Sequence, residues 1–246
     1  CLAPARSLAA PTATHPQVSI RSLLNSGANS VRVESDPSAS NRLYFSKRNG
    51  GIFRVTLNPG AGTSTSTQLF TAAQHGISSP LGFRIGTDGV FYLMGNEDVS
   101  ANLTTRMRIV RGVPGTNGTR IWSEVARTAP YEMGKTAFDH FFGGFAISPD
   151  GQYLIASSGS RTDHGEVQSN SGNFPGLRET GLTAILLKIP ITASNLVLLN
   201  DREWLRTNGY LFAEGLRNTF DIAHAPNGDL FGTDNGPDAD YPEEIN

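Results

Sequence analysis

The strongest constraint on the fold is a unit that recurs four times along the chain: a turn, a strand rich in aromatic and branched residues, a loop and a second strand. In most copies the turn is Asp-Gly or Asn-Gly, which suits a backbone with positive φ, whereas the first copy has Asn-Arg. The first strands are predicted within residues 41–46, 88–94, 149–156 and 226–232. The second strands of the first three copies are predicted within residues 50–57, 106–111 and 183–189.

The spacing of these units predicts an all-β fold of the β-propeller type. The equivalent positions Leu43, Val90, Tyr153 and Leu230 are 47, 63 and 77 residues apart. The smallest spacing matches a four-stranded propeller blade of about 40–50 residues, and the larger ones indicate insertions, which usually gather on one face. A β-sandwich of hairpins is the alternative fold. Since the fourth copy is short, we expect an incomplete propeller over residues 18–246, preceded by a flexible Ala/Pro/Thr-rich leader at 1–17.

Composition excludes several classes of protein. Charged residues make up 17% of the chain, beside 27 Gly and 14 Pro, which favours short strands and loops over long helices or coiled coils. The net charge of −2 gives no basic field to attract nucleic acid. We expect no transmembrane segment, because no apolar stretch approaches 18 residues. The single Cys1 forms no internal disulfide; it marks either a lipid anchor before a loose tether or an arbitrary starting point of the chain.

The first candidate for chemistry is His140, in the segment Phe-Asp-His-Phe-Phe-Gly-Gly-Phe at 138–145. A His in a Gly-flanked loop before a blade strand can point into the central channel, where a neutral imidazole serves as a general base near pH 7. The adjacent Asp139 is a candidate for orienting it. The alternative is a histidine whose hydrogen bonds are satisfied within its loop.

The second candidate is the pair Arg217 and Asn218, at the entry to the fourth copy. A planar cation beside an amide suits a carboxylate or a developing oxyanion. A structural salt link between blades is the alternative.

The third candidate is an acidic segment. Residues 218–246 hold seven acids and no Lys or Arg, whereas the rest of the chain holds 20 basic and 15 acidic residues. Carboxylates beside glycine and proline, which expose carbonyl groups, suit a hard cation such as Ca²⁺, although a solvated acidic loop has the same composition. The spacing is not that of an EF-hand, and the lone Cys and scattered His residues form no zinc set.

Four stretches, in this order, resemble the soluble pyrroloquinoline quinone (PQQ)-dependent sugar dehydrogenases, the glucose/sorbosone dehydrogenase family of six-bladed propellers. They are residues 73–76 with 81–83, residues 139–140 with 144 and 148–151, residues 215–218, and residues 235–238 with 243–246. The resemblance covers about residues 40–246, and its last two stretches are the most specific.

The resemblance implies a role for each candidate. His140 would take the proton from the anomeric hydroxyl while hydride passes to the quinone. Ca²⁺, held by the carbonyls of Gly236 and Pro237, would polarise a quinone carbonyl, and Arg217 would stabilise charge on its oxygen. Gln74 and Asn218 would position the cofactor, with Arg217.

Two departures from the family pattern leave questions open. Further basic residues that grip the quinone carboxylates in the family lie in later blades, beyond this chain. The long segment from Arg161 to Arg178 differs from glucose-specific members; Arg161, His164 and Glu166 are either sugar contacts or part of a surface loop.

The favoured function is therefore a secreted or periplasmic quinoprotein that oxidises an aldose or related pyranose to its lactone and passes electrons to an external acceptor. The alternatives are a non-catalytic binding propeller and a calcium-dependent lactone hydrolase on a similar propeller.

Overall fold

The computed structural model describes residues 12–58, 64–100, 103–238 and 244–245. The predicted lipid anchor at Cys1, part of the predicted leader and the acidic residues Asp240 and Glu243 lie outside these residues. Within the described part of the chain, no helix combines the length and the apolar character that crossing a membrane requires.

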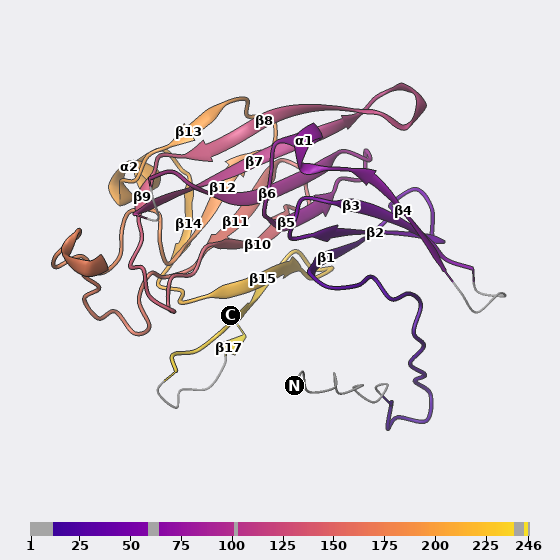
Figure 1. The fold of residues 1–246 in the computed structure, drawn as a ribbon, viewed down its shortest axis with the longest axis horizontal. Coiled ribbons are helices and arrows are strands. Elements are labelled where there is room, and N and C mark those ends of the chain that lie inside the picture. The colour runs from indigo at the N-terminus through magenta and orange to yellow at the C-terminus, as the bar shows by residue number, and fades with distance from the viewer. Residues whose placement is uncertain (1–11, 59–63, 101–102, 239–243, 246) are drawn as a thin grey trace, which may run out of the picture.

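The described strands form four successive sheets of mainly antiparallel strands (Figure 1). The first contains β1 (Ser30–Ser35), β2 (Arg42–Lys47), β3 (Ile52–Thr56) and β4 (Thr65–Phe70). The second contains β5 (Pro80–Ile85), β6 (Phe91–Asp98), β7 (Thr104–Pro114) and β8 (Arg120–Thr128), with β9 (Tyr131–Glu132) paired to β7. The third contains β10 (Phe142–Ile147), β11 (Tyr153–Ser158), β12 (Ile185–Pro190) and β14 (Leu211–Glu214). The fourth contains β15 (Thr219–His224), β16 (Leu230–Asp234) and β17 (Glu244–Ile245).

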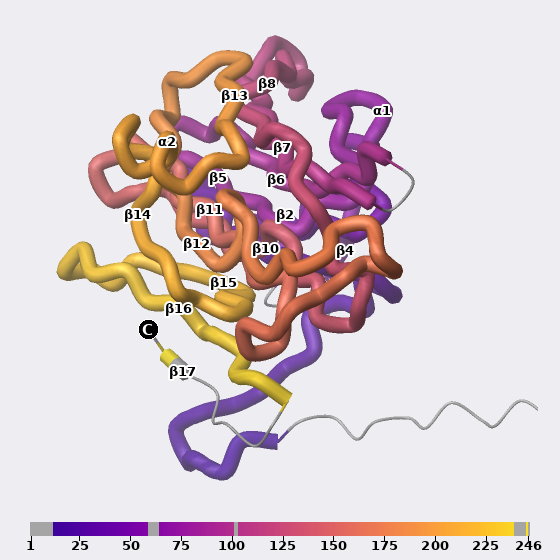
Figure 2. The backbone as a smooth tube through the Cα atoms, turned by 90° about the vertical axis from the view of Figure 1, so that its left-hand side faces the viewer, coloured from indigo at the N-terminus to yellow at the C-terminus, as the bar shows by residue number. Residues whose placement is uncertain are grey.

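Neighbouring sheets meet through their first strands: β1 contacts β5, β5 contacts β10, and β10 contacts β15. Figure 2 shows β15 beside β10 and β11. This arrangement of successive blades around an axis is that of a β-propeller, and it excludes the β-sandwich alternative. The repeat predicted from sequence is confirmed, because Leu43, Tyr153 and Leu230 lie in the second strand of their blades and Val90 immediately precedes one.

The widest repeat spacing has two structural causes. The segment between β11 and β12 is long, and the chain after β12 returns to the second blade, where β13 (Leu196–Leu198) pairs in parallel with β8. Helix α2 (Arg202–Thr207) then leads to β14, and Asp201 caps it by accepting a hydrogen bond from the N–H of Trp204 at 3.0 Å.

The core lies between adjacent blades. Met94 and Met107 of the second blade pack with Phe145, Leu154 and Leu187 of the third, all without exposed surface. Each such side chain stabilises the fold by about 1.5–3 kcal/mol relative to exposure. The blades are thereby fixed relative to one another, which fixes the loops at their ends.

The innermost strands also carry ion pairs that link the blades. Arg84 of β5 lies 2.6 Å from Glu34 of β1 and 2.9 Å from Asp221 of β15. Arg32 of β1 donates to the carbonyl groups of Phe220 and Gly143 at 2.8 and 3.1 Å. Burial raises the pKa of Glu34, although the charge of Arg84 opposes this shift.

The two ends of the propeller differ in their connections. At one end, which we call the turn end, short turns join the first and second strands of each blade. These turns are residues 36–41, 86–90, 148–152 and 225–229. At the other, the loop end, lie the segments that enter the first strands at 71–79, 133–141 and 215–218, together with the long β11–β12 segment and residues 235–238. His140, Arg217, Asn218, Gly236, Pro237 and Gln74 all belong to the loop end.

Candidate functional site

His140 lies immediately before β10 and is held by one residue of the next loop. The carbonyl of Ser160 accepts hydrogen bonds from the backbone N–H of His140 at 2.9 Å and from its Nδ1 at 3.1 Å. Because a carbonyl only accepts, Nδ1 carries the proton and Nε2 keeps its lone pair. Burial, and secondarily the charge of Arg217, lower the pKa of the imidazole, while Asp139 and Asp163 act in the opposite direction. His140 is therefore neutral near pH 7 and has a free basic nitrogen.

Asp139 does not orient His140 in this arrangement. Its carboxylate accepts the backbone N–H groups of Gly134, Lys135 and Thr136, at 2.6, 2.5 and 3.3 Å. Asp139 thus shapes the loop that enters β10. Adjacent side chains on extended backbone diverge, which separates the two functions.

Gly159 allows the His140 and Arg217 segments to meet. A Cβ atom at Gly159 would lie 2.2 Å from the Cβ of His140 and 3.2 Å from the carbonyl oxygen of Arg217. The next residue, Ser160, donates its backbone N–H to that same Arg217 carbonyl at 2.6 Å. The end of β11 therefore bridges the two candidate residues through Gly159 and Ser160.

Arg217 is held by two loops. Its Nε donates to the carbonyl of Asp163 at 2.9 Å, one terminal nitrogen donates to the Asp163 carboxylate at 2.6 Å, and the other donates to the carbonyl of Asn235 at 3.0 Å. The guanidinium has five N–H groups, and these bonds use three of them, so each terminal nitrogen keeps one. The side chain is 13% exposed, which leaves it accessible from the loop end.

Asp234, at the end of β16, holds the backbone of the 215–218 segment. Its carboxylate accepts the backbone N–H of Arg217 at 3.1 Å and that of Asn218 at 2.5 Å. Asp234 is buried, so it is a structural acceptor and is not free to ligate a metal through those oxygens. Asp238, in contrast, has a side chain that is 76% exposed.

The loop that is predicted to hold calcium adjoins Arg217. Pro237 lines a hollow of about 240 Å³ together with Ser160, His164 and Arg217. Among the described residues, no three His, Cys, Asp or Glu side chains gather as a metal site. Any cation here would depend on backbone carbonyl groups of the kind predicted for Gly236 and Pro237, which suit Ca²⁺.

Gln74 lies away from this cluster. It is in the short helix α1 (Ala72–His75), where its side-chain oxygen accepts the backbone N–H of Thr71 at 2.9 Å. It lines a separate hollow with Phe70, Arg120 and Trp122. The structure thus brings together His140, Arg217, Asn218 and Pro237, but it does not bring Gln74 to them.

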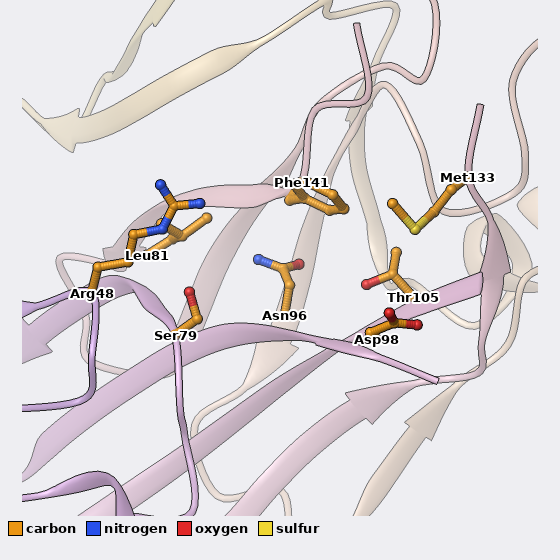
Figure 3. A pocket seen from close by; sticks show the side chains of 8 residues that line it. All are labelled: Arg48, Ser79, Leu81, Asn96, Asp98, Thr105, Met133 and Phe141. Carbon is orange, nitrogen blue, oxygen red and sulfur yellow. The ribbon is translucent and has the colours of Figure 1, made fainter. Parts of the chain in front are cut away.

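A further hollow, of about 180 Å³, lies beside Phe141 (Figure 3). Phe141, the residue after His140, lines it with Arg48, Ser79 and Asn96. The amide of Asn96 accepts from the N–H of Phe142 at 3.2 Å and donates to its carbonyl at 2.8 Å, which anchors the start of β10. The chain neighbour of His140, Phe141, thus lines one hollow, and its hydrogen-bond partner, Ser160, lines the other.

Three supporting residues were not predicted as such: Ser160, Asp163 and Asp234. Their partners on other loops are 16 to 75 residues away in the chain. Asp234 was counted only among acids near a cation, and Asp163 was not singled out within the long β11–β12 segment. The Asp-His-Gly-Glu run at 163–166 was the available signal.

The fold and the site together define a β-propeller with a polar, partly buried His–Arg cluster at one end of its axis. No family model matches the chain, and no curated protein matches it. Two solved structures share its fold. One is the holo form of the PQQ domain of pyranose dehydrogenase from Coprinopsis cinerea, with a TM-score of 0.56 and 16% identity over 91% of this chain and 49% of that one. The other is a putative oxidoreductase (glucose dehydrogenase) from Thermus thermophilus, with a TM-score of 0.53 and 17% identity over 89% of this chain and 62% of that one.

The chain therefore spans about half to three fifths of the length of these two proteins. At such identities the similarity establishes the fold, and it agrees with the family resemblance found in the sequence. Function is a separate question, because propellers carry many activities.

Proposed function

We propose that this chain contributes the catalytic end of a PQQ- and calcium-dependent oxidoreductase that oxidises an aldose or related pyranose to its lactone. The observation that carries the proposal is the geometry of His140. Its Nδ1 is occupied by Ser160, its Nε2 is free, and Arg217 lies in the adjoining loop. Two proteins with this fold are described as a PQQ-containing pyranose dehydrogenase domain and a glucose dehydrogenase.

Arg217 and Asn218 supply the type of hydrogen-bond donor that an anionic quinone would need. Arg217 keeps N–H groups that its bonds to Asp163 and Asn235 do not use. The Asn218 side chain is part-exposed beside it and is a candidate second contact. In the proposal, Arg217 and Asn218 would hold the quinone, and the carbonyl groups of Gly236 and Pro237 would hold Ca²⁺ next to it. When bound, the quinone would accept hydride from the sugar.

The protein's own part in the reaction is proton removal and orientation. The free Nε2 of His140 would take the proton of the anomeric hydroxyl, and the Ser160 carbonyl would stabilise the proton that Nδ1 already carries. Arg217 would stabilise negative charge beside it. The hollow lined by Ser160, Arg217 and Pro237 would offer room for substrate.

The experiment that tests the proposal is quinone reduction. PQQ and Ca²⁺ are added to the protein, an aldose is supplied, and the absorbance of the oxidised quinone is followed. The wild-type protein should bleach it. His140→Ala should lower turnover about 10²–10⁴-fold, because it removes the base while leaving Arg217 in place.

Two other results would point elsewhere. Lactone hydrolysis by protein without quinone would favour a hydrolase, and quinone binding without reduction by any aldose would favour a binding propeller. The proposal also includes a secreted or periplasmic location and an external electron acceptor, both of which the family resemblance implies.

A further inference from the structure

Asp163 occupies the start of the long β11–β12 segment, and its side chain is only 7% exposed. A buried carboxylate is costly unless it is paired and hydrogen-bonded, so its partners indicate what keeps it there. Those partners come from three different loops at the loop end.

The first partner is Arg217, whose guanidinium donates two N–H groups to Asp163. One goes to the Asp163 carboxylate at 2.6 Å, and the other goes to the Asp163 backbone carbonyl at 2.9 Å. Two bonds to one residue fix the plane of the guanidinium as well as its position. Without them, a long Arg side chain would keep much of its rotamer freedom and would sample several orientations.

The other partners tie Asp163 to its surroundings. The backbone N–H of Asp238 donates to the same carboxylate oxygen at 3.1 Å, and Nδ1 of His164 lies 3.2 Å from the second oxygen. Glu166 accepts the backbone N–H groups of Asp163 and His164 at 2.9 and 2.8 Å. One carboxylate thus joins the β11–β12 segment, the loop before β15 and the loop after β16.

The charges of Arg217 and Asp163 also act on His140. Arg217 brings a positive charge next to His140, and Asp163 brings the opposite charge to the same neighbourhood. Asp139 is the other charged group that acts on His140. A salt bridge that only joined the loops would not need to lie beside the imidazole of His140.

We infer that Asp163 is a positioning residue of this site: it orients the guanidinium of Arg217 and balances its charge beside His140. The long β11–β12 segment is then part of the site and not a peripheral insertion. This inference rests on the proposed function for its catalytic consequence, but its structural content concerns the three side chains alone.

The test is the protonation of His140, followed by NMR titration of the full chain without quinone or sugar. The His140 signal is identified by its loss in His140→Ala. Asp163→Asn keeps an oxygen acceptor and removes one negative charge, so the midpoint of His140 should move to lower pH. Arg217→Gln removes the positive charge, so the midpoint should move to higher pH. The double variant should fall between the two.

A general loosening of the loops would move the His140 midpoint in the same direction in both variants. Opposite shifts therefore report the charges of Asp163 and Arg217. Asp150→Asn is the matched control, since this exposed Asp at the turn end also accepts two hydrogen bonds, and it should leave the midpoint unchanged. An unshifted midpoint in Asp163→Asn, or shifts of equal sign in both variants, would overturn the inference.

The catalytic consequence is read separately in the quinone-reduction assay. Asp163→Asn should lower kcat about 10- to 100-fold with a smaller change in KM for the sugar, because a misoriented Arg217 disturbs alignment more than encounter. Opposite shifts together with no activity in the wild-type protein would contradict the proposed function and support the positioning role. Activity that is unchanged in Asp163→Asn would contradict the positioning role and leave the proposed function standing.

Discussion

The turn end and the loop end of the propeller are built by different kinds of contact. At the turn end, each turn is closed by a side chain that accepts the backbone N–H two residues ahead, as Asp88 does from Val90 and Asp150 from Gln152. At the loop end, the contacts that hold His140 and Arg217 join residues 17 to 57 positions apart. One end is therefore a local property of the sequence, and the other exists only once the blades have assembled.

The largest expected effect is at Gly159, where the loop end has no room to adjust. Gly159→Ala places a Cβ against the Cβ of His140 at 2.2 Å, so one of the two segments must move. Overpacking of this kind should lower the free energy of unfolding by about 3 kcal/mol. It should also lower kcat about 100-fold, because the site is displaced. Chemical denaturation and the quinone assay measure the two effects, and a protein of wild-type stability and activity would show that the ends tolerate change equally.

Asp234→Ala should be the next largest. It removes the acceptor of the Arg217 and Asn218 N–H groups from a buried position, which costs about 1–3 kcal/mol for each donor left unpaired. Asp150→Ala, at the turn end, removes the acceptor of Ser148 and Gln152 but leaves them open to water, so its loss of stability should be clearly smaller. Equal losses in denaturant midpoint for the two variants would contradict the contrast between the ends.

Acid should weaken the loop end through Glu166. Partial burial opposes the shift, but hydrogen bonds from the backbone N–H groups of Asp163 and His164 outweigh it and lower the pKa of Glu166 to about 2. A carboxylate whose pKa is lower in the folded state stabilises the protein above its unfolded value of about 4.5, and this stabilisation is lost as pH falls toward 2. The protection of residues 163–166 against hydrogen exchange, relative to an unfolded chain at the same pH, should therefore fall between pH 4.5 and 2. In Glu166→Gln this loss of protection should be absent, and its persistence would assign the acid sensitivity to another group.

The smallest effect is expected at Gly151, in the turn after β10. Its φ is +68°, which disfavours any side chain, but a Cβ there meets nothing within 4 Å. Gly151→Ala should cost about 1 kcal/mol of stability through backbone strain alone. It should leave turnover unchanged, which the quinone assay checks; a loss of turnover would show that the turn end also shapes the site.

The same contrast decides how much was predictable from sequence. The blade pattern was predicted because a turn residue such as Gly151 and the alternation in a strand such as 106–111 act over a few residues. His140 and Arg217 were found because their local sequences resemble a known family. Asp163 and Asp234 were not assigned their supporting roles, since these depend on which loops the propeller axis brings together. The role of Gln74 as a cofactor contact stays a prediction; in the structure its side-chain oxygen accepts the backbone N–H of Thr71.

The most direct test of the central claim, that the loop end binds an anionic quinone through Arg217, is an equilibrium titration of PQQ with Ca²⁺ into the protein. Wild-type protein and Arg206→Ala should bind alike, because Arg206 pairs with Glu203 and Glu214 on and beside α2 and does not line the hollow that Arg217 and Pro237 share. Arg217→Ala should weaken binding at least about 10-fold, the loss of one charge-assisted hydrogen bond of about 1.5–3 kcal/mol. Equal affinity of Arg217→Ala and Arg206→Ala would contradict the claim.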